Sequence, residues 1–175
     1  QQLVEKYQQK IYNFGMRMCG ESRDAEDLVQ ETFLTIFRYL KGFRYETRFK
    51  NWMYRVATTT CLKARRKPKH APERELSLEE FMPGEGEDLP DQAPDWAQRP
   101  LDQLLNEELA AHIKNAIIDL PKKYRMVMVL RDQEGFSTEE TAQMLDISVS
   151  NAKVRLHRAR LFVREKLKGY FDHDA

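Results

Sequence analysis

Between residues 68 and 100 the chain carries six of its seven prolines and a strong excess of acidic side chains. Proline breaks helices and removes backbone donors, and a segment with few apolar residues cannot bury enough surface to fold by itself. Its apolar cluster consists of Leu76, Leu78, Phe81 and Met82. We therefore expect a flexible linker that divides the chain into two folded domains.

The distribution of charge supports the same division. Residues 1–70 carry 15 Lys and Arg against 7 Asp and Glu, residues 71–106 carry 2 against 10, and residues 107–175 carry 12 against 11. The net charge of +1 thus hides a basic, an acidic and a mixed block. We predict one domain over residues 1–69, an acidic linker over residues 70–100 and a second domain over residues 101–175.

Apolar residues on both sides of the linker recur at steps of three and four, which places them on one face of a helix. No alternating strand pattern occurs in the sequence, so we expect an all-α fold. The predicted apolar faces are Leu3, Tyr7, Ile11, Phe14 and Met18 before Gly20; Ala25, Leu28, Val29, Thr32, Phe33, Ile36, Phe37 and Leu40 before Gly42; and Leu101, Leu105, Leu109, Ile113 and Ile117.

The starts and ends of these helices are also predicted. Ser22 or Asp24 is expected to cap the second helix. A third helix is predicted from about Trp52 to Lys67, after a loop, and another starts at Pro121, turns Met126, Val129 and Leu130 inward and ends at Gly135. The stripe from Ala25 to Leu40 is wider than one small core requires. Either this helix is packed on two sides, or part of the stripe meets a partner protein.

Residues 136–171 have the pattern of a helix-turn-helix. Ser137 and Glu140 predict a capping box at the start of a first helix, and Ser148 is placed to cap a second. In that second helix Ala152, Leu156, Ala159, Val163 and Leu167 share one face, whereas Ser150, Asn151, Lys153, Val154, His157 and Arg158 point elsewhere. Seven cations and one anion lie between Lys153 and Lys168. This density favours a helix that enters the DNA major groove over a merely solvated basic face.

Aromatic and basic residues alternate from Phe43 to Arg55, and basic residues continue to Lys69. Rings stack on unpaired bases while Lys and Arg hold phosphates, so the pattern favours single-stranded nucleic acid. The alternative is that most of these rings pack in the core, and we expect this in part for Trp52 and Phe43.

Several other kinds of protein are not indicated. No apolar run is long enough for a membrane span, and there is no signal peptide. The sequence has no Gly-rich phosphate loop, metal-ligand spacing or nucleophile–base motif, so we expect no catalysis, metal or cofactor. Cys19 and Cys61 are interpreted as buried thiols of a reducing cytoplasm. Because the chain begins with Gln1 in a helical pattern, we expect further residues upstream.

Two parts of the chain resemble the conserved regions of a known family. DAEDLVQETFLTIFRYL (24–40) and FKNWMYRVATTT (49–60) resemble region 2 of bacterial extracytoplasmic-function (ECF, group IV) sigma factors of the sigma-70 family. LPKKYRMVMVLRDQEGFSTEETAQMLDISVSNAKVRLHRAR (120–160) resembles their region 4. The resemblance implies an alternative sigma factor that binds core RNA polymerase at the β′ clamp and β flap and directs promoter-specific initiation in the cytoplasm. It also implies a stress-response regulon and control by an anti-sigma factor.

The resemblance further implies three binding surfaces. The polymerase clamp would be contacted by Asp24, Asp27, Gln30, Glu31 and Phe33. The minus-ten element, with a flipped base of the non-template strand, would be held by Phe49, Lys50, Asn51, Trp52, Tyr54, Arg55, Thr59, Lys63, Arg65 and Arg66. The minus-thirty-five duplex would face Ser150, Asn151, Lys153, Val154, His157 and Arg158, while Arg155 and Arg160 contact phosphate or form surface pairs. Thr59 stands where the family often has Asn, and Val154 where it often has Ser.

Three other functions compete with this one. A stand-alone regulator would use the helix-turn-helix on duplex DNA, which leaves residues 24–67 unexplained. An interaction module would bind an acidic protein through its basic first half, and an enzyme would need a motif that is absent. For the linker, the family implies a nucleic-acid mimic threaded through the polymerase channels, and the alternative is a solubilising tether.

Overall fold

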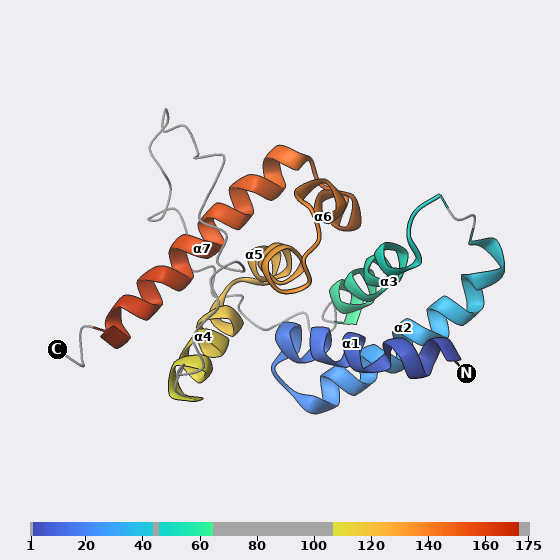
Figure 1. The fold of residues 1–175 in the computed structure, drawn as a ribbon, viewed down its shortest axis with the longest axis horizontal. Helices are drawn as coiled ribbons and strands as arrows, with labels where there is room; N and C mark the ends of the chain where they lie inside the picture. Colours follow the sequence, from blue (N-terminus) through green and yellow to red (C-terminus); the bar gives the residue numbers. More distant parts are fainter. Residues whose placement is uncertain (1, 44–45, 65–106, 172–175) are drawn as a thin grey trace. The chain divides into compact units, whose positions relative to one another are not determined.

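The computed structural model describes residues 2–43, 46–64 and 107–171, and every regular element in these ranges is a helix (Figure 1). The chain forms two compact units. The first contains α1 to α3, and we describe α4 to α7 as the second. We keep the whole of α6 (Thr138–Leu145) there because it is one continuous helix, and Thr138 Oγ1 at its start accepts a hydrogen bond from Arg131 Nε (3.2 Å). The all-α prediction is confirmed. The predicted linker, the domain boundaries at residues 69 and 100, Leu101 and Leu105 lie outside the described residues.

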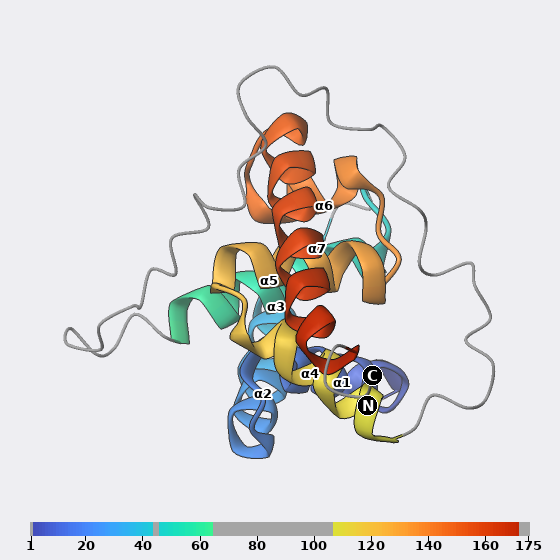
Figure 2. The same cartoon turned by 90° about the vertical axis from the view of Figure 1, so that its left-hand side faces the viewer.

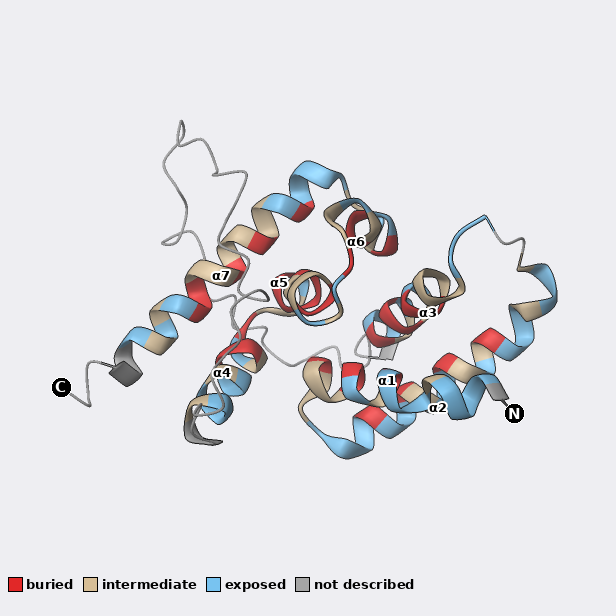
Figure 3. Cartoon of the chain, in the orientation of Figure 1, coloured by how far each residue is buried: buried red, intermediate tan, exposed pale blue. Residues whose placement is uncertain are grey.

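The central helix of the first unit is α2 (Ser22–Tyr39), which continues into the short 3-10 turn η1 (Leu40–Gly42). Both α1 (Gln2–Cys19) and α3 (Phe49–Ala64) pack against it. Its buried residues are Ala25, Leu28, Thr32 and Ile36. Figure 3 draws the buried segments of α2 in red. The interpretation of this helix as one packed on two sides agrees with the structure.

A close crossing of α1 and α2 occurs at Gly15. A Cβ atom added at Gly15 would lie 2.9 Å from the Cα of Ala25 and 3.0 Å from its Cβ. Because real Cβ atoms do not approach backbone this closely, the two helices can cross here only with glycine at position 15. Beside the crossing, the buried ring of Phe14 meets the buried ring of Tyr54 from α3 edge-on, with centroids 5.5 Å apart.

The start of α2 differs from the prediction. Its N-cap residue is Glu21, whose side chain makes no capping hydrogen bond. Ser22 lies inside the helix, where its Oγ donates to Glu26 Oε1 (3.0 Å) and pairs with Tyr12 Oη (3.0 Å). The prediction that Ser22 or Asp24 caps this helix is therefore wrong. The reason is the turn at Gly20, whose positive φ of 82° ends α1 and leaves Glu21 as the extended residue before the next helix.

The start of α3 lies earlier than the sequence predicts. Phe49 is its first residue, and Trp52 N already donates to Arg48 O (3.1 Å). Residues 49–51 thus belong to a helix and not to the predicted loop. Phe49 packs against the rings of Tyr7 and Phe43. The contact between Tyr7 and Phe49 joins residues far apart in sequence, so no local pattern reveals it. The predicted end at Lys67 lies outside the described residues.

The second unit is organised along α7 (Val149–Phe171), which packs against α5 (Lys122–Met128) and α4 (Glu107–Asp119), as Figures 1 and 2 show. Most of α5 is buried (Figure 3). Pro121 is the N-cap residue of α5, and the π-helical turn η4 (Val129–Gln133) continues it up to Gly135, whose φ is 72°. The predicted start at Pro121, the end at Gly135 and the burial of Met126, Val129 and Leu130 are confirmed.

A buried arginine joins α4 to α5. Arg125 donates from Nε (3.3 Å) and Nη2 (2.9 Å) to Leu120 O, and from Nη2 to Ile118 O. Carbonyls at the end of a helix have no partner within that helix, so the guanidinium satisfies acceptors that would otherwise be buried unpaired. Nothing in the sequence pattern distinguishes Arg125 from a surface arginine.

Candidate polymerase and nucleic-acid interfaces

The helix-turn-helix has the capping bonds that the sequence predicts. At the start of α6 (Thr138–Leu145), Glu140 N donates to Ser137 Oγ (3.1 Å) and Ser137 N donates to Glu140 Oε2 (2.9 Å). This reciprocal pair is a capping box. Asn151 N donates to Ser148 Oγ (3.1 Å) at the start of α7. Between the helices Asp146 adopts a positive φ of 54°, a conformation that Asp tolerates better than most residues.

Two arginine side chains connect the π-helical turn η4 with the helix-turn-helix. Arg160 of α7 makes a bidentate pair with Asp132, with Nη2–Oδ1 and Nε–Oδ2 distances of 2.7 and 2.9 Å. Arg131 donates from Nη1 to Phe136 O (3.3 Å) in addition to its bond with Thr138. Arg160 is therefore engaged in an internal pair. This agrees with the second of the two roles that the sequence left open for it.

The first turns of α7 present polar residues outward. Ala152, Leu156 and Ala159 are buried, as predicted, and Phe162 is a buried residue that the predicted face omitted. Of the residues predicted to face duplex DNA, Ser150, Asn151 and Lys153 are exposed, whereas Val154, His157 and Arg158 are half-buried. The six residues thus share a surface whose exposure falls along the helix.

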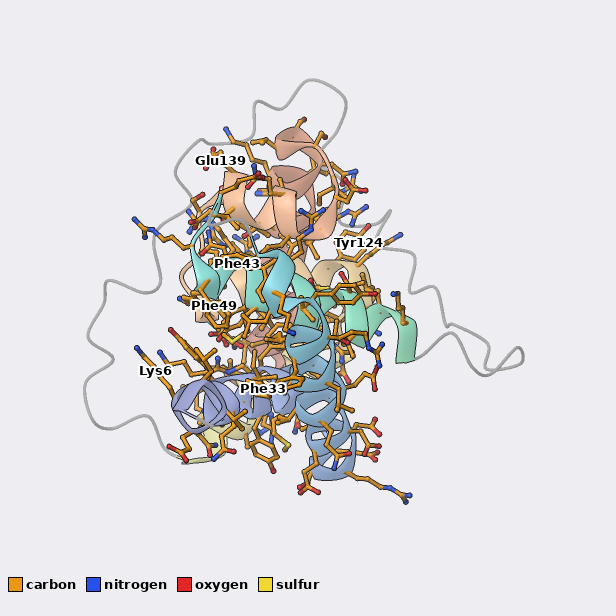
Figure 4. All side chains as sticks on the ribbon, turned by 90° about the vertical axis from the view of Figure 1, so that its right-hand side faces the viewer. Lys6, Phe33, Phe43, Phe49, Tyr124 and Glu139 are labelled. Atoms are coloured by element: carbon orange, nitrogen blue, oxygen red, sulfur yellow. The ribbon has the colours of Figure 1, made fainter. Side chains whose placement is uncertain are left out.

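An ionised carboxylate lies near this surface. The pKa of Glu139, an exposed residue in the first turn of α6 (labelled in Figure 4), is lowered by a hydrogen bond from its own backbone amide and then by the Ser137 side chain. The positive charges of Lys153 and Arg131 lower it further. A carboxylate is also favoured at a helix N-terminus by the helix dipole. Glu139 therefore places negative charge close to the basic start of α7.

Four aromatic rings from three parts of the first unit form a cluster at the start of α3. The centroid of the Phe49 ring lies 5.6 Å from that of Tyr7, 5.9 Å from that of Phe43 and 5.8 Å from that of Trp52. Phe43 and Trp52 are themselves 5.0 Å apart. All four side chains are half-buried. We call Tyr7, Phe43, Phe49 and Trp52 the aromatic cluster. The partial burial expected for Trp52 and Phe43 is confirmed, and Tyr7 is a member that sequence reasoning missed.

The exposed face of α3 continues from the aromatic cluster as a basic stripe. Arg55, Thr59 and Lys63 are exposed and lie at steps of four, with Thr59 Oγ1 donating to Arg55 O (2.8 Å). Lys50 and Asn51 are half-buried at the start of the helix. Arg65 and Arg66 lie outside the described residues.

Tyr54 does not share this surface. Its exposed fraction is 0%, and its ring packs against Phe14 in the core. This burial contradicts the prediction that Tyr54 contacts a base. Tyr54 lies on the same inner face of α3 as Ala57 and Cys61, both buried, so its position follows from the helical register and not from the alternation of rings and cations.

The outward face of α2 combines acidic and apolar side chains. Asp24, Asp27, Gln30 and Glu31 are exposed and Phe33 is half-buried. At about 100° per residue, Asp24 and Phe33 lie on opposite margins of this face. Between the margins, Phe37 is 84% and Leu34 is 58% exposed. Phe37 belongs to the apolar face predicted from the sequence, whereas Leu34 is not part of that face. Phe37 is not covered by α1 or α3, because the part of α2 that they bury is on the opposite side.

Two further features are absent from the described residues. Among the helices of this part of the chain, none has both the length and the apolar composition of a membrane span. Within residues 2–43, 46–64 and 107–171, His, Cys, Asp and Glu side chains form no group of three that suits a metal ion.

Sequence families match both units of the chain. Residues 3–70 match Sigma-70 region 2, and residues 112–163 match Sigma-70, region 4. The chain is also 34% identical over 166 residues to the ECF RNA polymerase sigma factor SigW of Bacillus subtilis, a match that covers 95% of this chain and 87% of the relative. The chain belongs to the ECF family of RNA polymerase sigma factors. As a member, it is a transcription initiation factor.

A second relative and two solved structures agree with this family. The sigma factor is 32% identical over 170 residues to the RNA polymerase sigma-H factor of Pseudomonas aeruginosa, with 95% of this chain and 84% of the relative covered. Its fold is similar to that of the sigma factor RpoE from Bartonella quintana, solved with the anti-sigma factor NepR (TM-score 0.67, 22% identity, 95% of each chain). It is also similar to CnrH, solved with the cytosolic domain of CnrY (TM-score 0.61, 22% identity, 99% and 88% of the chains).

The family match assigns each candidate surface to a region. The outward face of α2, the aromatic cluster and the basic stripe of α3 lie within region 2, whose match spans residues 3–70. The start of α7 lies within region 4, whose match spans residues 112–163.

Proposed function

We propose that this sigma factor binds the β′ clamp of core RNA polymerase through the outward face of α2. The observation that carries the proposal is the exposure of Phe37 (84%) and Leu34 (58%) on a helix that also exposes Asp27 and Gln30. An apolar centre with a polar border is typical of a protein interface. Asp24, Glu31 and Phe33 form the margins of this interface, and region 4 contacts the β flap.

The same protein holds the opened non-template strand of the minus-ten element at the start of α3. Rings at the edge of the aromatic cluster stack on an extruded base and replace the contacts that it loses in the duplex. The residues that we assign to this site are Phe49, Lys50, Asn51, Trp52, Arg55, Thr59 and Lys63, together with Arg65 and Arg66. Tyr54 supports Phe14 in the core and is left out.

Region 4 reads the minus-thirty-five duplex through the first turns of α7. Lys153 and Arg158 are suited to guanine edges, and the side chain of Val154 is suited to a thymine methyl group. Ser150, Asn151 and His157 complete this surface. Arg160 is not assigned to DNA because its guanidinium is paired with Asp132.

An anti-sigma factor controls this protein by covering the polymerase-binding face. RpoE of Bartonella quintana was solved with an anti-sigma factor, and its fold is similar to that of this chain. Exposed Leu34 and Phe37 offer such a partner the apolar anchors that dominate protein interfaces. We place this regulation in the cytoplasm and expect the target genes to form a stress-response regulon.

Reconstitution with core polymerase tests the proposed function. The mixture is expected to initiate transcription from a promoter that core polymerase alone does not use. A stand-alone regulator would instead bind duplex DNA tightly without polymerase and would not support initiation.

A double variant tests the polymerase-binding face. Asp27→Arg with Gln30→Ala is expected to abolish co-purification with core polymerase while the unfolding temperature stays unchanged, because both side chains are exposed. Glu5→Arg with Gln9→Ala is the matched control, since it makes the same change of charge at exposed positions of α1. Co-purification of the Asp27 and Gln30 variant at the wild-type level would show that α2 docks elsewhere.

A further inference from the structure

We propose that α1 forms an outer border of the single-strand site, with Lys6 and Lys10 binding phosphates of the strand whose bases lie on the aromatic cluster. This inference rests on the proposed function of the start of α3, and it adds a helix to which neither the motifs nor the basic and aromatic pattern of residues 43–69 assign a role. The ligand is the phosphodiester backbone of single-stranded DNA.

The geometry joins α1 directly to the aromatic cluster. The ring of Tyr7 lies 5.6 Å from that of Phe49, the first residue of α3. The ammonium groups of Lys6 and Lys10 lie 5.5 and 5.8 Å from the centroid of the Tyr7 ring. In Figure 4 the labelled residues Phe43, Phe49 and Lys6 follow one another along the same side of the first unit. Rings and cations from two helices thus form one continuous surface.

The charges of this surface favour an anion. Lys6 and Lys10 are exposed and four residues apart, so like charges are neighbours on the helix, an arrangement that disfavours the isolated helix. Neither ammonium group pairs with a carboxylate in the described part of the chain. A phosphate between or beside them removes the repulsion.

The spacing also suits a single strand better than a compact anion. Side chains at positions i and i+4 of a helix have Cβ atoms about 5–6 Å apart. Flexible lysine side chains at this separation can reach successive phosphates of one strand. Tyr7, whose ring both ammonium groups approach, keeps the backbone of the strand beside the rings of Phe49 and Trp52, where its bases stack.

The test uses holoenzyme assembled from core polymerase and the full chain. The probe is a fork-junction DNA whose single strand is selected by the wild-type holoenzyme from a random pool and which lacks the upstream duplex element. Lys6→Gln with Lys10→Gln is expected to weaken binding. Since each phosphate contact to a single strand contributes about 0.7 to the slope of log affinity against log salt concentration, the slope should fall by about 1.4.

Two further variants separate charge from structure. Lys6→Arg with Lys10→Arg keeps both charges and is expected to keep the slope. Lys114→Gln with Lys123→Gln removes two charges from exposed positions, and Lys123 also lies over a tyrosine ring, that of Tyr124, at 5.2 Å. This control is expected to leave the slope unchanged, because both residues lie in the second unit and the proposed single-strand site lies in the first.

Three results would overturn the inference. An unchanged slope in a folded Lys6 and Lys10 double variant would limit both lysines to structural contacts with Tyr7. Loss of core polymerase binding without DNA would assign them to an acidic protein surface. Failure of the wild-type holoenzyme to bind any strand from the pool would contradict the proposed function of the start of α3 itself.

The single variants Lys6→Gln and Lys10→Gln test the inference with a smaller perturbation of α1. Each should change the slope by about half as much as the double variant.

Discussion

Side-chain hydrogen bonds hold three helix ends of the second unit, those of α4, α6 and α7, although α5 starts at Pro121 without one. Ser137 and Ser148 cap α6 and α7, and Arg125 satisfies the carbonyls at the end of α4. In the first unit no such bond caps the start of α2, and the start of α3 packs through the aromatic ring of Phe49. The contrast suits the proposed functions, because the capping bonds fix the start of α7, whereas the outward face of α2 is exposed since α1 and α3 bury its opposite side.

The largest effect on stability is expected when the hydrogen bonds at the end of α4 in the second unit are removed. Arg125→Met should lower the free energy of unfolding by about 3 kcal/mol, because each hydrogen bond to a charged group contributes about 1.5–3 kcal/mol and buried carbonyls lose their donor. Urea unfolding followed by circular dichroism measures this loss. Lys123→Met, an exposed change on the same helix, should stay within about 0.5 kcal/mol of wild type. Equal stability of the two variants would contradict the role given to Arg125.

The next largest effect on stability is expected when the close packing of α1 against α2 in the first unit is disturbed. Gly15→Val should lower the free energy of unfolding by about 1–3 kcal/mol, since α1 and α2 must separate to admit the side chain. Gly42→Val is the matched control, because a Cβ added at Gly42 meets nothing within 4 Å. Thermal unfolding compares them. If both variants unfold at the wild-type temperature, the close crossing does not stabilise the unit.

The smallest effect compares two serines near helix starts. Ser137→Ala removes half of a capping box and should cost about 1 kcal/mol of unfolding free energy. Ser22→Ala removes no cap and should change stability by less than about 0.5 kcal/mol. Urea unfolding measures the free energy of unfolding of both variants. If Ser22→Ala loses as much stability as Ser137→Ala, the two units do not differ in how their helix starts are held.

The contrast also explains which features are readable from the sequence. Ser137, Glu140 and Ser148 act on residues three positions away, so a local pattern predicts their bonds correctly. The pairing of Arg160 with Asp132 spans 28 positions, and the sequence offered a surface pair for Arg160 as one of two roles without indicating its partner.

In the first unit the errors have the same origin. The burial of Tyr54 and the exposure of Phe37 depend on which side of each helix meets a neighbour, and the early start of α3 depends on ring contacts with α1. The alternation of rings and cations grouped Phe43, Phe49 and Trp52, and these three rings do lie together. It did not separate the rings of the core from those of the surface, because both kinds share one segment.

The crossing of α1 and α2 has a consequence for how this sequence can evolve. An added Cβ at Gly15 would lie 3.0 Å from the Cβ of Ala25, so each position limits the size of the other. A larger residue at either position is acceptable only after the helices have moved apart, and that movement alters the packing of Phe14. Natural variation at positions 15 and 25 should therefore be correlated, with small residues at both or a wider helix separation that accommodates larger ones at both.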